Sequence, residues 1–217
     1  MAALRVREGL DFVVDQAVDF KQAEQLPPVP MPPSYMSEPV TLQSYFDVEG
    51  FGTNMPLFRR KALVCMGAWD EELPCGQDME FFGRVLARGL RAAYVPDGLA
   101  YQRIHDGQLS RRMSLEELRR GHLLSAEKLV RHVIRNGQVV PVGLRRNRLL
   151  YRFHLRAMHG DAVGALDDLR GLSPLFTPQE RVFRLKLWVR YLILRLAGVR
   201  AYTFIFDTYR RLKRLTV

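Results

Sequence analysis

The strongest structural signal in the chain lies in residues 67–105, which read GAWDEELPCGQDMEFFGRVLARGLRAAYVPDGLAYQRIH. A helix is predicted over 78–88, because apolar residues recur there at helical spacing and Gly89 follows as a helix stop. Two extended segments are expected over 92–104, with Pro96-Asp97-Gly98 as the turn between them. This alternation of helix and strand predicts an α/β fold.

Upstream of this stretch, the sequence predicts short strand and helix segments and one irregular loop between them. Residues 11–20 combine Phe, Val and Ala in a pattern that suits a strand. Residues 25–39 contain six prolines and are expected to form an irregular loop, which serves either as a lid over a site or as a plain connector. Residues 55–59 read as a short apolar segment, and 60–66 as a helical turn.

Downstream, the pattern becomes helical. Ser114 and Glu117 have the spacing of a capping box and predict the start of a helix that runs toward Arg135. Residues 137–143 break this helix. Three further helices are expected, over 144–159, 161–171 and 178–196, the first two forming an αα-hairpin.

The charge distribution divides the 217 residues into two parts. The whole chain carries a formal charge of +10, yet residues 1–110 hold 10 basic and 15 acidic side chains, whereas 111–217 hold 23 basic and 8 acidic ones. We therefore expect an α/β domain over 1–112 and a basic, all-α region over 113–217. The excess of arginine in the second part suits either an anionic surface or solvated helix faces.

Composition also excludes several classes of protein. Cys65 and Cys75 lack the spacing of zinc ligands or of a disulfide framework, so a reducing, cytoplasmic setting is favoured. Residues 1–15 contain no long apolar run of the secretory type. No spanning helix is expected either, because arginines interrupt the most apolar stretch at 190, 195 and 200.

Five short motifs follow one another between residues 51 and 112. They are the G-x-N…R-R element of 52–60, G-x-W-D-E-x-L of 67–73, G-x-D-x-E-F-F-x-R of 76–84, V-P-D of 95–97 and R-x-H-D-G-x-x-S of 103–110. In this order and spacing they resemble the C-terminal half of the catalytic domain of a family 2 glycosyltransferase. The resemblance implies a partial GT-A fold with a mixed sheet, followed by the helical region.

In that family, the carboxylate of the acid motif removes the proton from the acceptor hydroxyl as it attacks a nucleotide-sugar, with inversion at the anomeric carbon. The resemblance assigns this role to Asp78. A carboxylate at a helix N-terminus is kept ionised by the helix dipole, which suits a general base. Gln77 stands where the family more often has Glu, and its amide can bind an acceptor hydroxyl.

Three further candidates, His105, Arg103 and Trp69, have two interpretations each. By resemblance, His105 contacts the divalent cation (Mn²⁺ or Mg²⁺) or the donor diphosphate; alone, it reads as a hydrogen-bonding residue at a strand end. Arg103 suits either a diphosphate or a solvated surface. Trp69 is either a platform for the acceptor sugar or a core residue. Asn54 is a candidate donor contact, and Arg59 is expected to be structural.

The resemblance also implies parts that the sequence lacks. A GT-A enzyme holds its cation and nucleotide-sugar with a D-x-D motif in an N-terminal nucleotide-binding half, and no D-x-D occurs in this chain. We therefore expect the chain alone to be inactive as a transferase. Whether it is an enzyme at all stays open.

The C-terminal region offers the alternative function. Leu185, Val189, Leu192 and Leu196 recur at helical spacing among arginines, as in an amphipathic basic helix. Such a helix lies on a membrane or packs on the catalytic domain, and the resemblance, with its glycan or lipid-linked acceptors, favours the inner face of a membrane. The alternative is a non-catalytic module that binds a membrane surface or a partner protein. Nucleic acid is the least favoured partner, because no RNA-binding motif or zinc finger is present.

Overall fold

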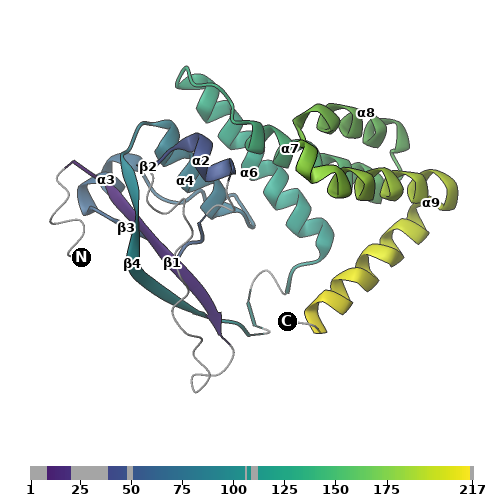
Figure 1. Cartoon of the computed structure of the whole chain (residues 1–217), viewed down its shortest axis with the longest axis horizontal. Helices are drawn as coiled ribbons and strands as arrows, with labels where there is room; N and C mark the ends of the chain where they lie inside the picture. Colours follow the sequence, from purple (N-terminus) through teal and green to yellow (C-terminus); the bar gives the residue numbers. More distant parts are fainter. Residues whose placement is uncertain (1–8, 21–38, 48–50, 106, 109–111, 216–217) are drawn as a thin grey trace.

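The computed structural model describes residues 9–20, 39–47, 51–105, 107–108 and 112–215 (Figure 1). The proline-rich residues 25–38 lie outside these ranges. The described part has both strands and helices, as predicted. Figure 1 shows a twisted sheet at the N-terminal side and a stack of helices that continues to the C-terminus.

The sheet is small and mixed, with strand order β2-β4-β1-β3. The strand β1 (Phe12–Phe20) lies parallel to β4 (Ala92–Arg103) and antiparallel to β3 (Pro56–Phe58), while β2 (Pro39–Val40) pairs antiparallel with β4. The segment expected over 11–20 is therefore an inner strand. Its residues Phe12 and Val14 are fully buried, as expected for a strand with neighbours on both edges.

β4 differs from the sequence prediction, which placed a turn at Pro96-Asp97-Gly98. The strand is continuous through these residues, and the pairing register shifts instead. Val14 pairs with Tyr94, but Gln16 pairs with Leu99, so β4 advances by five residues while β1 advances by two. The extra residues are accommodated as an irregularity of the β-bulge kind, because β1 pairs with β4 on both sides of them.

The helix α4 (Gln77–Ala87) covers the sheet, and its boundaries match the prediction to within one residue. It ends in a Schellman motif, since Gly89 has φ of 83° and Leu90 N–H donates to Val85 O. The short helices α2 (Leu42–Asp47) and α3 (Arg60–Met66) complete this layer. The core between sheet and helices is rich in aromatic rings, namely those of Phe12, Tyr45, Phe51, Phe58, Phe81 and Phe82.

One ion pair lies inside this layer. Arg84 Nε donates to Glu80 Oε1 at 2.7 Å, and both side chains are buried. The arginine also donates to the backbone oxygens of Met66 and Ala68. A sequence separation of four predicts this pair, but its burial and its two carbonyl partners come from the tertiary fold.

The helix α6 (Leu115–Arg135) joins the helical region to the α/β layer. Ser114 and Glu117 form the predicted capping box, with Ser114 Oγ accepting from Glu117 N–H at 3.2 Å. A Cβ on Gly83 of α4 would lie 2.3 Å from Leu129 of α6, so the two helices approach closely. The core of the α/β layer takes in Ala126, Leu129 and Val133 and thus continues beyond residue 112.

The helices α7 (Val142–Met158) and α8 (Ala162–Leu172) form the expected αα-hairpin. Asp161 caps α8 by accepting from Gly164 N–H at 2.8 Å. The buried carboxylate of Asp168 joins the two helices, because it accepts from Arg152 at 2.7 Å and from Arg156 at 3.1 Å. A second hydrophobic core fills this part of the molecule.

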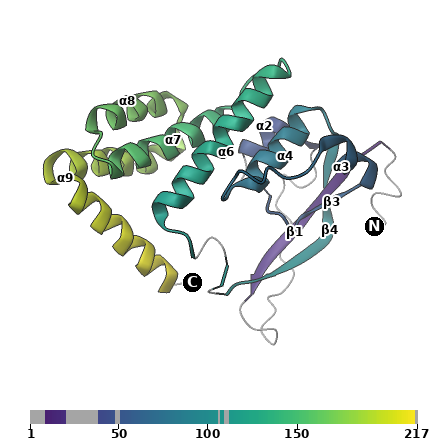
Figure 2. The ribbon, with the colours of Figure 1, turned by 180° about the vertical axis from the view of Figure 1, so that it is seen from behind.

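The chain ends in α9 (Arg181–Leu215), which packs against α7 and α8. Two 3-10 turns, Ser173–Leu175 and Pro178–Glu180, precede it. Gly198, with φ of 79°, interrupts α9, and Figure 2 shows the second half turning sharply away from the first. Nowhere in the described residues does a helix have the length and apolar character needed to span a membrane.

Candidate functional site

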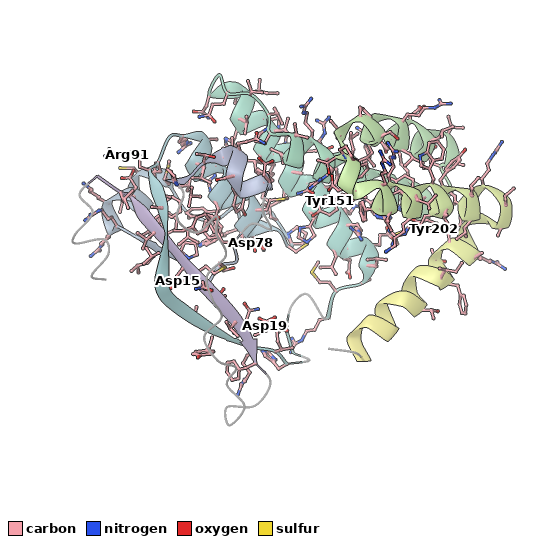
Figure 3. The ribbon with its side chains drawn as sticks, viewed as in Figure 1. Asp15, Asp19, Asp78, Arg91, Tyr151 and Tyr202 are labelled. Carbon is pink, nitrogen blue, oxygen red and sulfur yellow. The ribbon has the colours of Figure 1, made fainter. Side chains whose placement is uncertain are left out.

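Asp78 lies in the first turn of α4, at the junction between the α/β layer and the helical region (Figure 3). Its carboxylate is half-buried, and Oδ1 accepts the Met79 N–H at 2.8 Å. Oδ2 makes no hydrogen bond to any residue that the structure describes. One carboxylate oxygen is therefore fixed while the other is available to a ligand.

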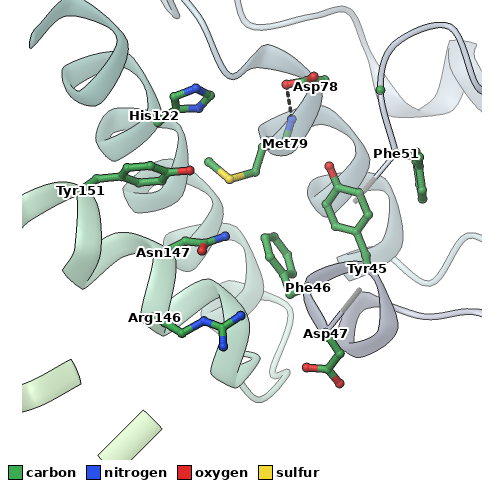
Figure 4. Close-up of a pocket in the computed structure, with 11 residues that line it drawn as sticks. Tyr45, Phe46, Asp47, Phe51, Asp78, Met79, His122, Arg146, Asn147 and Tyr151 are labelled. Atoms are coloured by element: carbon green, nitrogen blue, oxygen red, sulfur yellow. Dashed lines mark hydrogen bonds between the residues drawn. The ribbon is translucent and has the colours of Figure 1, made fainter. Parts of the chain in front are cut away.

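A cavity of about 450 Å³ opens beside Asp78 (Figure 4). Its volume falls within the usual range of small-molecule sites, about 300–1,000 Å³. It has an aromatic wall on the α/β side and a polar wall on the helical side. Its lining consists of Tyr45, Phe46, Asp47, Phe51, Gly52, Asp78, Met79, His122, Arg146, Asn147 and Tyr151.

A second cavity, of about 710 Å³, adjoins Asp78 from the side of the preceding loop. Asp78 and His122 line both cavities, so these two side chains stand between them. The remaining lining residues come from the loops before α4 and from α6. They are Thr53, Trp69, Asp70, Glu71, Leu73, Cys75, Gly76, Gln77 and Leu118.

The polar wall of the first cavity includes residues that the sequence interpretation did not select. The ring of His122 on α6 stacks on that of Tyr151 on α7, with centroids 5.2 Å apart. His122 Nδ1 is buried and has no hydrogen-bond partner among the described residues. Figure 4 shows that the Tyr151 hydroxyl and the Asn147 amide point into the same space. A ligand beside Asp78 would thus meet groups from the helical region.

Burial keeps these groups uncharged. It lowers the pKa of His122, although the Asp78 carboxylate opposes this shift. Burial also raises the pKa of Tyr151 and, together with the charge of Asp78, that of Tyr45. Near neutral pH, Asp78 therefore faces neutral hydroxyl and imidazole groups, which suit hydrogen bonding to a hydroxyl-rich ligand.

Small residues on α6 allow this helix to pack closely against the loop before α4. A Cβ on Gly121 would lie 2.3 Å from Cys75 Sγ, and Ser125 Oγ donates to Gly76 O at 2.7 Å. Gly76 itself has φ of 75°, and its added Cβ would lie 2.9 Å from His122 Nδ1. The spacing of Gly121 and Ser125, four residues apart on one helix face, is the sequence signal that could have marked this contact.

Cys75 is not a candidate nucleophile. Burial raises the pKa of its thiol, and Sγ lies 3.5 Å from Leu118 O. A thiol of raised pKa is mostly protonated at neutral pH, whereas the thiolate is the reactive form.

Trp69 and Gln77, the predicted acceptor contacts, both line the second cavity. Trp69 is 39 % exposed, and its ring lies tilted against that of Phe81 with centroids 4.4 Å apart. Trp69 thus has one face on the core and a part open to a ligand. Gln77 is the first residue of α4, and its Nε2 donates to Leu73 O at 2.7 Å. This bond holds the side-chain amide against the loop before α4.

Asn54, Arg103 and His105 are placed differently. All three are exposed, and none lines either cavity beside Asp78. Arg103 and His105 lie at and just beyond the end of β4. Arg59, expected to be structural, donates from Nε to Leu10 O at 2.7 Å.

The described residues do not offer a binding site for the divalent cation. Among them, no three His, Cys, Asp or Glu side chains come together as metal ligands. Asp15 on β1 has a buried Oδ1 without a partner among these residues, and burial raises its pKa. A single carboxylate does not by itself fit a hard cation, which takes several oxygen ligands.

No family model, curated protein or solved structure matches the chain. The function is therefore inferred from the geometry around Asp78 and from the motifs of residues 52–110.

Proposed function

We propose that the protein takes part in glycosyl transfer, with Asp78 as the general base that activates an acceptor hydroxyl. The observation that carries this proposal is the position of Asp78. Its carboxylate is in the first turn of a helix and lies between two cavities, whose walls combine aromatic rings with neutral and charged hydrogen-bonding groups. Sugars need both kinds of contact, because their rings present C–H faces and hydroxyl edges.

In the proposed reaction, the acceptor oxygen attacks the anomeric carbon of a nucleotide-sugar. The bond from that carbon to the nucleoside diphosphate breaks, and its electron pair leaves with the diphosphate. The acceptor proton passes to Oδ2 of Asp78. Oδ1 stays bound to the Met79 N–H, so the carboxylate keeps its orientation during the transfer.

The two cavities suggest how the acceptor is held. Trp69 and Gln77 would contact it on one side of Asp78, while His122, Asn147 and Tyr151 would contact it on the other. The helical region would then take part in acceptor binding. No step is assigned to a cation or to Arg103 and His105, since the described residues do not bring these groups to the cavities.

Donor binding requires more than the described residues. Among them, no three His, Cys, Asp or Glu side chains come together as ligands for a cation. We propose that a nucleotide-binding half supplies these functions, in line with the absence of D-x-D from the sequence. The 217-residue chain by itself should show no measurable transfer.

The test joins the chain to such a half and measures consumption of nucleotide-sugar. Asp78→Asn should lower kcat by about 10²–10⁴-fold, the usual contribution of a general base. The matched control is Asp167→Asn on α8, an exposed carboxylate that contacts only Arg170 on its own helix. Equal turnover by the wild type and Asp78→Asn would refute the assignment.

A second candidate function is binding without catalysis. The excess of basic residues after position 110 favours a module that attaches to a membrane surface or to a partner protein. The two functions differ in their dependence on Asp78. Attachment should survive Asp78→Asn unchanged, because the carboxylate lies in the cavity wall and not on the basic helices.

A further inference from the structure

The first half of α9 exposes an apolar stripe on the face turned away from the core. It consists of Val182, Leu185, Val189, Leu192 and Leu196, whose exposed fractions are 65, 64, 46, 49 and 83 %. Leu187 and Leu194 point the opposite way and are buried against the second core. At 1.5 Å per residue, the stripe is about 21 Å long. A continuous exposed surface of this kind marks a contact with something outside the molecule.

Basic side chains border the stripe on both sides. At 100° per residue, Arg181, Arg184 and Arg195 lie along one border and Lys186 along the other. All four are exposed, and none forms an ion pair with a residue that the structure describes. The sequence from 181 to 206 contains no Asp or Glu. The surface is therefore apolar in the middle and positive at its edges.

A second copy of the chain is a poor occupant of this stripe. The stripe residues alternate in spacing between three and four, as positions a and d of a coiled coil do. In this register, Arg181, Lys186 and Arg195 occupy the flanking e and g positions. In a homodimer these cations would face one another, and like charges there are destabilising. An occupant that is both apolar and negative satisfies the whole surface.

We propose that α9 docks on an anionic lipid bilayer and lies in the plane of its interface. The apolar stripe enters the boundary between headgroups and acyl chains, and the four cations bind lipid phosphates. The docking uses the face opposite Leu187 and Leu194, so the helix stays packed on α7 and α8 while it is bound. This inference does not depend on glycosyl transfer.

The test measures co-sedimentation of the full chain with two kinds of vesicle, phosphatidylcholine alone and phosphatidylcholine mixed with phosphatidylglycerol. The wild type should bind the anionic vesicles, and high salt should release it, because the Debye length shrinks from about 10 Å at 0.1 M to about 3 Å at 1 M. Leu185→Gln/Leu196→Gln should lower the partition coefficient at least about tenfold. Its control is Val139→Gln/Val163→Gln, which also removes two exposed apolar side chains, but elsewhere.

A second pair of variants tests the charges. Arg184→Gln/Arg195→Gln should weaken binding about tenfold or more, since each basic side chain near an anionic surface contributes substantially. Arg131→Gln/Arg135→Gln on α6 changes the net charge equally and should keep wild-type binding. Circular dichroism confirms that every variant is folded.

Three results would overturn the proposal. The first is equal binding of the wild type to neutral and anionic vesicles. The second is unchanged binding by both α9 variants. The third is a wild type that ignores vesicles but self-associates through Leu185 and Leu196, as shown by sedimentation velocity, which would assign the stripe to a second copy.

Discussion

Removing the buried carboxylate of Glu80 should destabilise the protein strongly. The side chain is 1 % exposed, and its partner Arg84 is 7 % exposed. In Glu80→Ala the guanidinium keeps its bonds to Met66 O and Ala68 O but loses its countercharge. Breaking a buried pair in this way costs about 3–5 kcal/mol, because it leaves an uncompensated charge in the interior.

The effect should extend to the candidate site. Arg84 ties the backbone at Met66 and Ala68 to α4, and the loop that begins there carries Trp69 and leads to Asp78. Loss of the countercharge should therefore loosen this loop as well as lower the free energy of unfolding. Trp69 fluorescence in a Trp188→Phe background reports on the loop.

The assay is equilibrium unfolding in urea, with Glu71→Gln as the control for removal of an exposed carboxylate. In Glu80→Leu/Arg84→Met the unpaired charge is gone, so this double variant should be more stable than Glu80→Ala. It should stay below the wild type, because the two backbone carbonyls lose their donor. A loss below about 1 kcal/mol in Glu80→Ala would refute the reasoning, since that is the range of an exposed pair.

Two further predictions concern the helical region. Ser114→Ala removes the side-chain half of the capping box and should cost about 1 kcal/mol in the same urea assay. Ser173→Ala should cost less, because the Ser173 hydroxyl donates to Leu169 O at the C-terminal end of α8 and caps no α-helix N-terminus. Equal costs would contradict the capping role. Burial lowers the pKa of His154, whose Nδ1 lies 2.8 Å from Tyr202 Oη. The unfolded state therefore binds a proton first, and stability should fall as the pH drops below about 6.5, the ordinary pKa of histidine. The slope of unfolding free energy against pH should become shallower in His154→Gln; an unchanged slope would show that this imidazole does not contribute.

Local signals predicted α4, α6 and the αα-hairpin, but they did not predict α2, and the helix expected over 178–196 is α9, which runs from 181 to 215. The apolar spacing and Gly89 gave α4 its extent, and Ser114 with Glu117 marked the start of α6. Such features act within a few residues of the chain, so the sequence contains all the groups involved. The same holds for the αα-hairpin, whose turn lies at Gly160 and Asp161.

The pairing of strands that are far apart in the sequence was harder to predict. Pro96-Asp97-Gly98 favours a turn locally, but β1 holds β4 on both sides of it and the strand continues. The pairing of β1 with β4 joins residues about eighty positions apart, and local propensity contains no information on it. For the same reason, the spacing of four between Glu80 and Arg84 favours an ion pair on one helix face but does not reveal its burial.

The sequence by itself determined the helix that carries Asp78, the order of the motifs around it and the basic character of the C-terminal half. Only the tertiary structure decided what surrounds the carboxylate. Packing of α6 and α7 against the α/β layer brings His122 and Tyr151 to Asp78. Packing of α9 on α7 and α8 leaves its apolar stripe exposed. The first outcome depends on which helix faces meet, as at the close contacts of Gly83 with Leu129 and of Gly121 with Cys75. The small residues on α6 can mark a close contact in the sequence, but they do not show which segment packs against them.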